Sequence, residues 1–401
     1  MKILHIVQDL GHGGVTNVIV NLFKAFYRFN VENVVITPQI RKELVVLLRA
    51  YTSHIFVLGG SVNPFNSAEY IPTRRKHITE IINQVKPDAI IIQPGWLSLV
   101  SRLIPDDIPM FVVVHGTYLN EIKYMWLHPI KGIERTRYIT GILASQAVEL
   151  LQLRLALTRR KLLVVAVSKN TRKELIGTGI QQNKVVSILN GVDKEVFKPM
   201  NKDYAKTQIE EIFEVRLRDK VLLHVNPGPI KGTHILIKAV AMLRRIYGDN
   251  FTLLIAGRLG PKTYREYVEN MVRGLKLEEN IKMLGYVEHE LLPLLYNAAD
   301  TTIVPSYSEG GPLITPESLA CGTPVIATNV GGNPEYLNMA GLTDYIIEIK
   351  QYDFSSTLAL KLLKALADNG RLDRNAMYDA VPGWYEDGYR YLYLLRKVQF
   401  H

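Results

Sequence analysis

Residues 2–29 read KILHIVQDLGHGGVTNVIVNLFKAFYRF. The run 2–7 is short, apolar and continuous, which is typical of a parallel strand covered on both faces. A glycine turn at 11–14 follows it, and residues 15–29 form a helical pattern. This strand, turn and helix predict the first unit of a parallel α/β sheet.

The same unit recurs along the chain. We predict further strands at 33–37, 54–58, 88–92, 110–114, 162–167 and 185–189, with helices between several of them, for example at 73–85. The pattern restarts after residue 200, with strands at 220–225, 252–256, 281–284, 301–304 and 324–327 and helices at 233–246, 262–274 and 289–297. The sequence therefore predicts two doubly wound, Rossmann-like α/β domains that face each other across a cleft, with a polar linker region at 194–219.

Composition excludes several classes of protein. The 401 residues are 47% hydrophobic and 21% charged, which suits packed cores and excludes a disordered chain. The single cysteine, Cys321, excludes a disulfide framework and a cysteine-rich zinc site. The N-terminus does not resemble a signal peptide, and no apolar run reaches the roughly 18 residues that a membrane-spanning helix needs. We expect a soluble, cytoplasmic protein.

The positive charge is concentrated in one half of the chain. Residues 1–200 hold 25 lysines and arginines against 14 aspartates and glutamates, a net charge of +11, and the remainder has a net charge of −1. A basic half can attract nucleic acid, an anionic membrane surface or a phosphorylated substrate, and the alternative is a solvated basic surface.

Polar residues follow several predicted strands, at the edge where open α/β sheets bind ligands. Gly14 ends a glycine turn that opens a helix and can face an anion, although neither a dinucleotide nor a Walker fingerprint is present. His115 follows the strand 110–114 and can exchange hydrogen bonds with a hydroxyl. In the second half, Lys231 precedes a helix as a point charge for phosphate, and Arg258 is a second candidate. The alternatives are a tight turn, a structural histidine and a surface arginine.

The strongest motif is PSYSEGGPLITPE at residues 305–317. It contains two carboxylates, Glu309 and Glu317, separated by seven residues. Glu309 lies in a Gly-Gly-Pro loop, and Glu317 lies near the start of a predicted helix, where negative charge is favoured. Carboxylates accept hydrogen bonds from sugar hydroxyls, and the N–H groups of the loop suit a diphosphate.

With these motifs in order, the chain resembles the retaining glycosyltransferases of the GT4 family, which have the GT-B fold. The specific signature is Glu309-x7-Glu317 followed by ACGTPV at 320–325. Supporting blocks are Gly13-Gly14, Ser168-Lys169, Asn190-Gly191-Val192-Asp193, Lys231-Gly232 and Pro305-Ser306. The resemblance covers nearly the whole chain.

The resemblance implies transfer of a hexosyl group from a nucleotide-diphosphate sugar to an acceptor hydroxyl, with retention and without an essential metal or other cofactor. It implies that an N-terminal acceptor-side domain comprises residues 1–198 and a terminal helix in 382–401, and that residues 199–381 bind the donor. The implied catalytic residues are His115, Lys231 and Glu309. The implied donor-binding residues are Gly14, Asn226, Lys231, Arg258, Gly311, Pro312, Leu313, Ile314 and Glu317, the last of these on the ribose.

Three positions depart from the family pattern. Asn226 stands where the family has an arginine, which removes one positive charge from the diphosphate site, and Arg258 is a candidate replacement. Pro312 removes one backbone donor from the glycine loop. Thr16 stands where a glutamate is common.

The sequence leaves the donor base, the donor sugar and the acceptor open. We expect an acceptor that is lipid-linked or a phosphorylated sugar and that docks on the basic half. Residues 147–163 read either as an amphipathic helix on the anionic inner membrane face or, as we favour, as a core helix leading into a strand. The alternatives are another sugar-nucleotide enzyme on this fold, such as an epimerase, and a nucleotide-sugar binder without turnover. We expect no nucleic-acid partner, because no nucleic-acid-binding motif is present.

Overall fold

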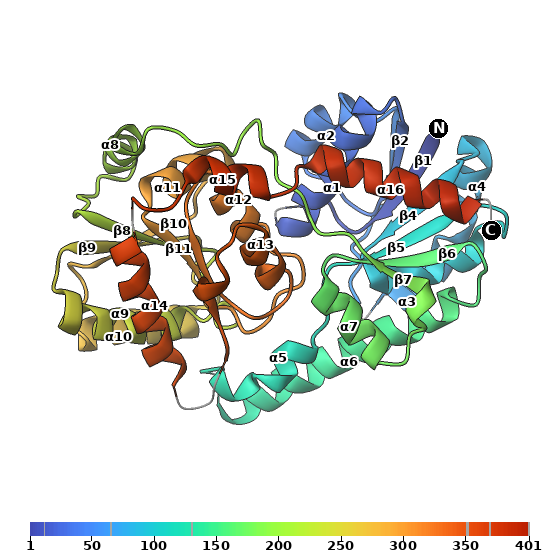
Figure 1. The fold of residues 1–401 in the computed structure, drawn as a ribbon. Coiled ribbons are helices and arrows are strands. Elements are labelled where there is room, and N and C mark those ends of the chain that lie inside the picture. The colour runs from blue at the N-terminus through green and yellow to red at the C-terminus, as the bar shows by residue number, and fades with distance from the viewer. Residues whose placement is uncertain (12, 65, 130, 350–352, 369, 400–401) are drawn as a thin grey trace. The chain divides into compact units, whose positions relative to one another are not determined.

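A seven-stranded sheet of parallel strands in the order β3-β2-β1-β4-β5-β6-β7 forms the centre of the first half of the chain (Figure 1). Its strands are β1 (Lys2–Val7), β2 (Glu32–Thr37), β3 (His54–Val57), β4 (Ala89–Gln93), β5 (Met110–Val114), β6 (Leu162–Ala166) and β7 (Val185–Ser187). This computed structural model describes the chain apart from residues 12, 65, 130, 350–352, 369 and 400–401.

Helices cover both faces of this sheet, so its strands are mostly apolar, with buried polar residues such as His5 and Asn33 as exceptions. Their bounds are α1 (Gly14–Arg28), α2 (Lys42–Arg49), α3 (Ser67–Thr73), α4 (Arg75–Val85), η1 (Gly95–Leu103), α5 (Leu119–Lys123), α6 (Gly132–Ala156), α7 (Lys169–Gly177), η3 (Gln182–Lys184) and α16 (Trp384–Gln399). Within β2, Val34 and Ile36 pack into one core and Val35 into the other. This alternation between two buried faces explains the continuous apolar runs.

A second sheet, with six parallel strands in the order β10-β9-β8-β11-β12-β13, forms the other half. Its strands are β8 (Lys220–Val225), β9 (Phe251–Ala256), β10 (Ile281–Gly285), β11 (Thr301–Val304), β12 (Val325–Thr328) and β13 (Ile346–Ile347). The helices here are η2 (Met125–Leu127), α8 (Lys202–Phe213), α9 (Thr233–Tyr247), α10 (Lys262–Gly274), η4 (His289–Leu291), α11 (Leu292–Ala298), α12 (Ile314–Ala320), α13 (Asn333–Met339), η5 (Thr343–Tyr345), α14 (Phe354–Asp368) and α15 (Arg374–Ala380). The predicted pair of parallel α/β sheets is confirmed.

The chain divides into two compact units. One, here the N-terminal unit, comprises Met1–Ile122, Lys131–Gly191 and Gly383–His401. The other, the C-terminal unit, comprises Lys123–Ile130 and Val192–Pro382. The chain thus passes between units after Gly191 and Pro382, where we expected boundaries near 198 and 382, and the short segment 123–130 was not anticipated in the C-terminal unit.

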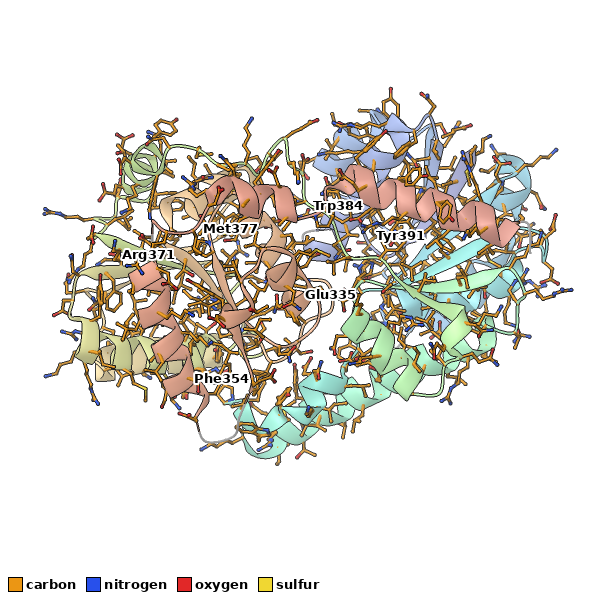
Figure 2. The ribbon with its side chains drawn as sticks, viewed as in Figure 1. Glu335, Phe354, Arg371, Met377, Trp384 and Tyr391 are labelled. Carbon is orange, nitrogen blue, oxygen red and sulfur yellow. The ribbon has the colours of Figure 1, made fainter. Side chains whose placement is uncertain are left out.

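The last helix, α16, belongs to the N-terminal unit and packs along α1 (Figure 1). Tyr391 of α16 (Figure 2) lies with its ring centre 6.2 Å from that of Phe26 on α1 and 6.0 Å from that of Phe111 on β5. Trp384, at the start of α16, is buried. The terminal helix in 382–401 thus packs on the N-terminal unit through aromatic contacts with α1 and β5.

One expectation about the connection was wrong. Residues 194–219 contain the helix α8, which Asn201 caps by accepting a hydrogen bond from the Tyr204 N–H. Ala205 and Ile209 are its buried residues. Because so few of its side chains are apolar and buried, the helix has the polar composition of a linker.

Candidate active site

The loop 226–232, which joins β8 to α9, carries Lys231. Its first residue, Asn226, has a left-handed backbone with φ 59° and donates its N–H to the Ala256 carbonyl over 2.8 Å. Asparagine tolerates this conformation better than most side chains. The backbone therefore gives a physical reason for asparagine at the position where the resembled family has arginine.

Lys231 and Glu309 form an ion pair, with Lys231 Nζ 2.7 Å from Glu309 Oε1. The Glu309 side chain is 9% exposed and that of Lys231 is 26% exposed. Two backbone features join their loops: Tyr307 donates its N–H to the Ile230 carbonyl over 3.0 Å, and a Cβ at Gly232 would collide with the Pro305 carbonyl. The structure thus brings together two residues that the sequence presents in separate motifs.

Gly331 and Gly332, downstream of both carboxylates, support the backbone of the Glu309 loop. Gly331 has φ 56°, and a Cβ there would lie 2.6 Å from the Glu309 carbonyl oxygen. Gly332 donates its N–H to the Gly310 carbonyl over 2.8 Å. The backbone of Gly331 and Gly332 therefore holds the loop that carries Glu309 in place.

Glu317 lies in the first turn of α12, is 7% exposed and has partners of its own. Tyr296 donates its hydroxyl to Glu317 Oε2 over 2.9 Å, and His289 Nε2 lies 3.7 Å from Oε1. Burial, together with the adjacent Glu317 carboxylate, raises the pKa of Tyr296 well above its usual value. Tyr296 thus remains a hydrogen-bond donor at neutral pH and holds the carboxylate in place.

The other predicted donor-binding residues of this unit lie in loops after strands. Gly311, Leu313 and Ile314 are partly exposed and Pro312 is buried, in the turn that leads into α12. Arg258 is exposed, and its guanidinium lies 5.4 Å from the centre of the Tyr286 ring. A Cβ at the preceding Gly257 would lie 2.6 Å from Pro227 Cδ, so the Arg258 loop packs against the loop that contains Asn226.

In the N-terminal unit, His115 follows β5 and pairs with Gln93 at the end of the adjacent strand β4. His115 Nε2 lies 3.1 Å from Gln93 Oε1. Burial lowers the pKa of His115 to about 4, so the ring is neutral at pH 7. Because the Gln93 amide oxygen can only accept, His115 Nε2 carries the ring proton. Nδ1 is then left to accept a hydrogen bond from a hydroxyl.

Glu174 on α7 fixes the loop that follows His115. It accepts hydrogen bonds from Thr117 Oγ1 over 2.5 Å, from Asn120 Nδ2 over 2.6 Å and from Asn170 Nδ2 over 2.8 Å. Ser168 caps the same helix, as expected, by accepting the Thr171 N–H over 3.1 Å. The loops after β5 and β6 are thereby held together at one edge of the sheet.

Gly14 is the exposed first residue of α1, and Gly13 before it has φ 131°. His12, in the same glycine turn, lies outside the described residues. Thr16, two residues later, is buried in the helix. The turn thus opens a helix as predicted.

Several supporting residues were missed by sequence reasoning. Tyr296 lies in a short apolar helix, Gln93 ends an apolar strand, and Glu174 lies in a charged helix. The sequence carries no spacing signal for any of them, because each contacts its partner only through tertiary packing.

Within the described residues, no group of three or more His, Cys, Asp or Glu side chains is placed to hold a metal ion. Among the helices built from those residues, none combines the length and the apolarity needed to cross a bilayer.

Comparison with known families assigns both halves of the chain. Residues 12–196 match the family described as Glycosyltransferase Family 4, and residues 205–380 match the family described as Glycosyl transferases group 1. The second match includes the Lys231–Glu309 pair and Glu317.

Curated relatives match over part of their length. A D-inositol 3-phosphate glycosyltransferase of Corynebacterium glutamicum is 35% identical over 155 residues, which is 38% of this chain and 37% of the relative. An uncharacterised glycosyltransferase of Methanocaldococcus jannaschii is 27% identical over 231 residues, which is 57% of this chain and 54% of the relative. The chain thus spans between about a third and about half of the length of these relatives.

Solved structures match over nearly the whole chain. A sucrose-phosphate synthase of Thermosynechococcus elongatus has a TM-score of 0.76 at 18% identity, with 99% of each chain covered. HepE of Anabaena, solved in complex with UDP-glucose, has a TM-score of 0.70 at 19% identity, with 99% of this chain and 100% of HepE covered. At such identities the likeness establishes the fold. With a Glycosyltransferase Family 4 half followed by a Glycosyl transferases group 1 half on two Rossmann-like sheets, the chain belongs to the GT4-type glycosyltransferases with the GT-B fold.

Proposed function

We propose that the protein is a retaining hexosyltransferase that takes its sugar from a nucleotide-diphosphate donor. The observation that carries this proposal is the Lys231–Glu309 ion pair, which combines a cation for the diphosphate with a carboxylate for the sugar. Both residues lie in loops that follow parallel strands, β8 and β11, where ligands bind in folds of this kind.

Lys231 is the group that offsets negative charge as the nucleotide leaves. Its ammonium group is partly exposed, so a diphosphate oxygen can replace Glu309 Oε1 as its partner. The charge that develops on the leaving phosphate is then stabilised by a lysine and backbone N–H groups. On this proposal no metal ion is needed, and turnover should persist in EDTA.

Glu317 is proposed to hold the ribose of the nucleotide. One of its oxygens accepts from Tyr296, and a carboxylate has further acceptor positions for two ribose hydroxyls. The backbone of residues 311–314, which leads into α12, is proposed to line the donor sugar and phosphates. Gly14, at the start of α1 in the N-terminal unit, is proposed separately as a backbone contact for an anion. Arg258 is proposed as an auxiliary cation in place of the family arginine.

The donor class has two lines of support. HepE, which is similar in fold, was solved with UDP-glucose, and the catalytic domain of starch synthase IV of Arabidopsis thaliana was solved with ADP. Both ligands contain a nucleoside diphosphate group, which suits a site built around one lysine. We take UDP-glucose as the first donor to test.

The acceptor is proposed to dock on the N-terminal unit. Residues 1–200 carry a net charge of +11, and the partly identical Corynebacterium relative is named for D-inositol 3-phosphate. A phosphorylated polyol or a lipid-linked phosphate would match this charge. His115, whose Nδ1 can accept a hydrogen bond from a hydroxyl, is proposed to orient the reacting sugar.

Membrane association remains part of the proposal. It rests on the net charge of +11 in residues 1–200, which suits an anionic cytoplasmic membrane surface. Within the stretch 147–163, Leu153 and Ala156 of α6 are buried just before β6, as expected for a core helix.

The proposed step occurs on one face of the sugar. The bond between the anomeric carbon and the phosphate oxygen breaks, and the acceptor oxygen bonds to the anomeric carbon on the same face. The proton of the acceptor hydroxyl passes to the leaving phosphate. Glu309, fixed by Lys231, positions the sugar and forms no covalent bond with it.

Product analysis tests the proposal. The protein is incubated with UDP-[14C]glucose and either inositol 3-phosphate or a bacterial lipid extract, and labelled products are separated. An α-linked glycoside supports the proposal, because the donor is itself an α-glycoside. A labelled epimer without a glycoside would favour the epimerase alternative, and binding without any product would favour a binder that has lost turnover.

A further inference from the structure

We propose that His224 and Thr233 are positioning residues for donor binding: a buried pair that closes the loop 226–232 and so fixes Lys231 beside Glu309. Neither residue belongs to the motifs described above. The proposal rests on the proposed function for the identity of the ligand, but its contacts are present in the free protein.

His224, on β8, is buried and forms two hydrogen bonds. Its Nδ1 lies 3.0 Å from the Ile303 carbonyl on the adjacent strand β11, and its Nε2 lies 2.9 Å from Thr233 Oγ1 at the start of α9. A carbonyl can only accept, so Nδ1 carries the ring proton. Nε2 is therefore an acceptor, and the Thr233 hydroxyl donates to it.

Thr233 also forms a hydrogen bond with the backbone of the loop 226–232. With its proton directed at His224, Thr233 Oγ1 accepts the Gly228 N–H over 2.9 Å. The Thr233 N–H also faces the Gly228 carbonyl, at a longer distance of 3.5 Å. The two ends of the segment 228–233 are thus joined by a short bond to the hydroxyl and a long backbone bond, and the hydroxyl is also bonded to the sheet. Lys231 lies within the closed segment.

The other polar group of Gly228 is also held. Tyr264 on α10 lies with its hydroxyl 3.2 Å from the Gly228 carbonyl and 3.1 Å from His234 Nδ1. His234 Nε2 in turn faces the Leu127 carbonyl at 2.8 Å. The backbone of the loop is consequently held by side chains from β8, α9 and α10.

The hydrogen bonds require a neutral His224. Burial is the main reason why the pKa of His224 is lowered to about 4. The hydrogen bond with the Ile303 carbonyl acts in the opposite direction, and the effects of Lys231 and Glu309 oppose each other. At neutral pH the ring is therefore in the tautomer that accepts from Thr233. The pair is formed under the conditions in which the enzyme is proposed to act.

A simple helix-capping role does not account for Thr233. The N-terminal cap of α9 is Gly232, which has φ 69° and makes no side-chain capping bond. The Thr233 hydroxyl instead connects the sheet to Gly228. Its removal should therefore act on the loop that carries Lys231.

The test compares Thr233→Val, which has the shape of threonine without the hydroxyl, with Thr233→Ser, which keeps it. The probe is UDP-glucose, and its Kd is measured by calorimetry in the wild-type and in the Lys231→Ala backgrounds. We expect Thr233→Val to weaken binding about tenfold, a cost of about 1.4 kcal/mol, and Thr233→Ser to restore it to within about twofold of the wild-type Kd. In the Lys231→Ala background Thr233→Val should add less than about twofold, since both changes remove one contact. A full tenfold effect in both backgrounds, or no effect in either, overturns the proposal.

A second measurement needs no ligand. Acetylation of Lys231 by acetic anhydride is followed by mass spectrometry, with the exposed Lys238 on the following helix α9 as the internal standard. We expect Thr233→Val, and not Thr233→Ser, to speed acetylation of Lys231 at least threefold. An unchanged rate overturns the positioning role. If wild-type protein binds no UDP-glucose while Lys231 responds as expected, the choice of donor fails and the positioning role stands. Thr233→Ala replaces Thr233→Val should the latter not fold.

Discussion

Lys231 Nζ lies 2.7 Å from Glu309 Oε1, and this ion pair joins two residues that are 78 positions apart in the sequence. The pair exists because β8 and β11 are neighbours in the sheet, so the loops after them meet at the same edge. A donor diphosphate is proposed to exchange with Glu309 for the lysine. The first two predictions separate the roles of these residues.

Replacing Lys231 by alanine should lower kcat/KM for transfer by about 100-fold or more, because a charge aimed at the leaving phosphate is lost. Steady-state transfer from UDP-glucose measures the effect. Lys238→Ala is the matched control, because it removes an exposed lysine from α9, the helix that follows the Lys231 loop, and should leave kcat/KM within about twofold. Equal losses in the two variants would argue against a specific role for Lys231.

Replacing Glu309 by glutamine should reduce turnover about 10-fold to 100-fold without trapping a glycosyl-enzyme. The amide keeps the size of the side chain but loses the charge that pairs with Lys231. Intact-protein mass spectrometry during turnover checks this. A hexosyl adduct on residue 309 of the wild-type protein would show that Glu309 is a nucleophile and would contradict the same-face step.

Asn226→Arg should bind UDP-glucose more tightly than the wild type and should melt at a lower temperature. The arginine adds a cation near the diphosphate site, but it must adopt the left-handed backbone of Asn226, at a cost of roughly 1 kcal/mol or more. Calorimetry and thermal melts measure the two effects. Asn226→Gly, which accepts the same backbone conformation and adds no charge, should show neither change. An unaltered melting temperature for Asn226→Arg would show that backbone strain is not the reason for an asparagine at this position.

Glu149 on α6 predicts a stability change with pH. It is buried against Gly95, and burial raises its pKa from 4.5 to about 8. When the pKa of a carboxyl is higher in the folded than in the unfolded protein, its contribution to the free energy of unfolding is fully present below pH 4.5. That contribution is lost as the pH rises towards 8. Glu149→Gln should therefore gain stability relative to wild type between pH 5 and pH 8.5, on the order of 4 kcal/mol.

Thermal melts of Glu149→Gln and wild type at both pH values check this. Glu80→Gln, at an exposed position on α4, should show no pH-dependent difference from wild type. A difference between Glu149→Gln and wild type that is the same at pH 5 and pH 8.5 would mean that Glu149 is ionised in the folded protein.

Much of the fold could be predicted from the sequence because strands covered on both faces are continuous apolar runs. The helix α10 begins and ends where its spacing predicts, at Lys262–Gly274. The helix α8 was missed because Ala205 and Ile209 alone are buried, which leaves a polar composition.

The site could be predicted in part. The motif spacing identified Glu309 and Glu317, and the Lys-Gly pair identified Lys231. The pairing of Lys231 with Glu309 depends on strand order, which local patterns do not contain. Likewise, Tyr296 reaches Glu317, and Gln93 reaches His115, only after distant elements pack together.

The central claim is that Lys231 holds the diphosphate of a nucleotide sugar. Isothermal titration calorimetry of wild-type and Lys231→Ala protein against UDP-, GDP- and ADP-glucose, with the corresponding free nucleosides as reference ligands, measures it most directly. We predict that wild type binds one of the three nucleotide sugars, that Lys231→Ala binds it at least about tenfold more weakly, and that the affinity for the free nucleoside is the same in both proteins. Absence of binding to all three sugars by the wild type, or equal affinities in the two proteins, would contradict the account.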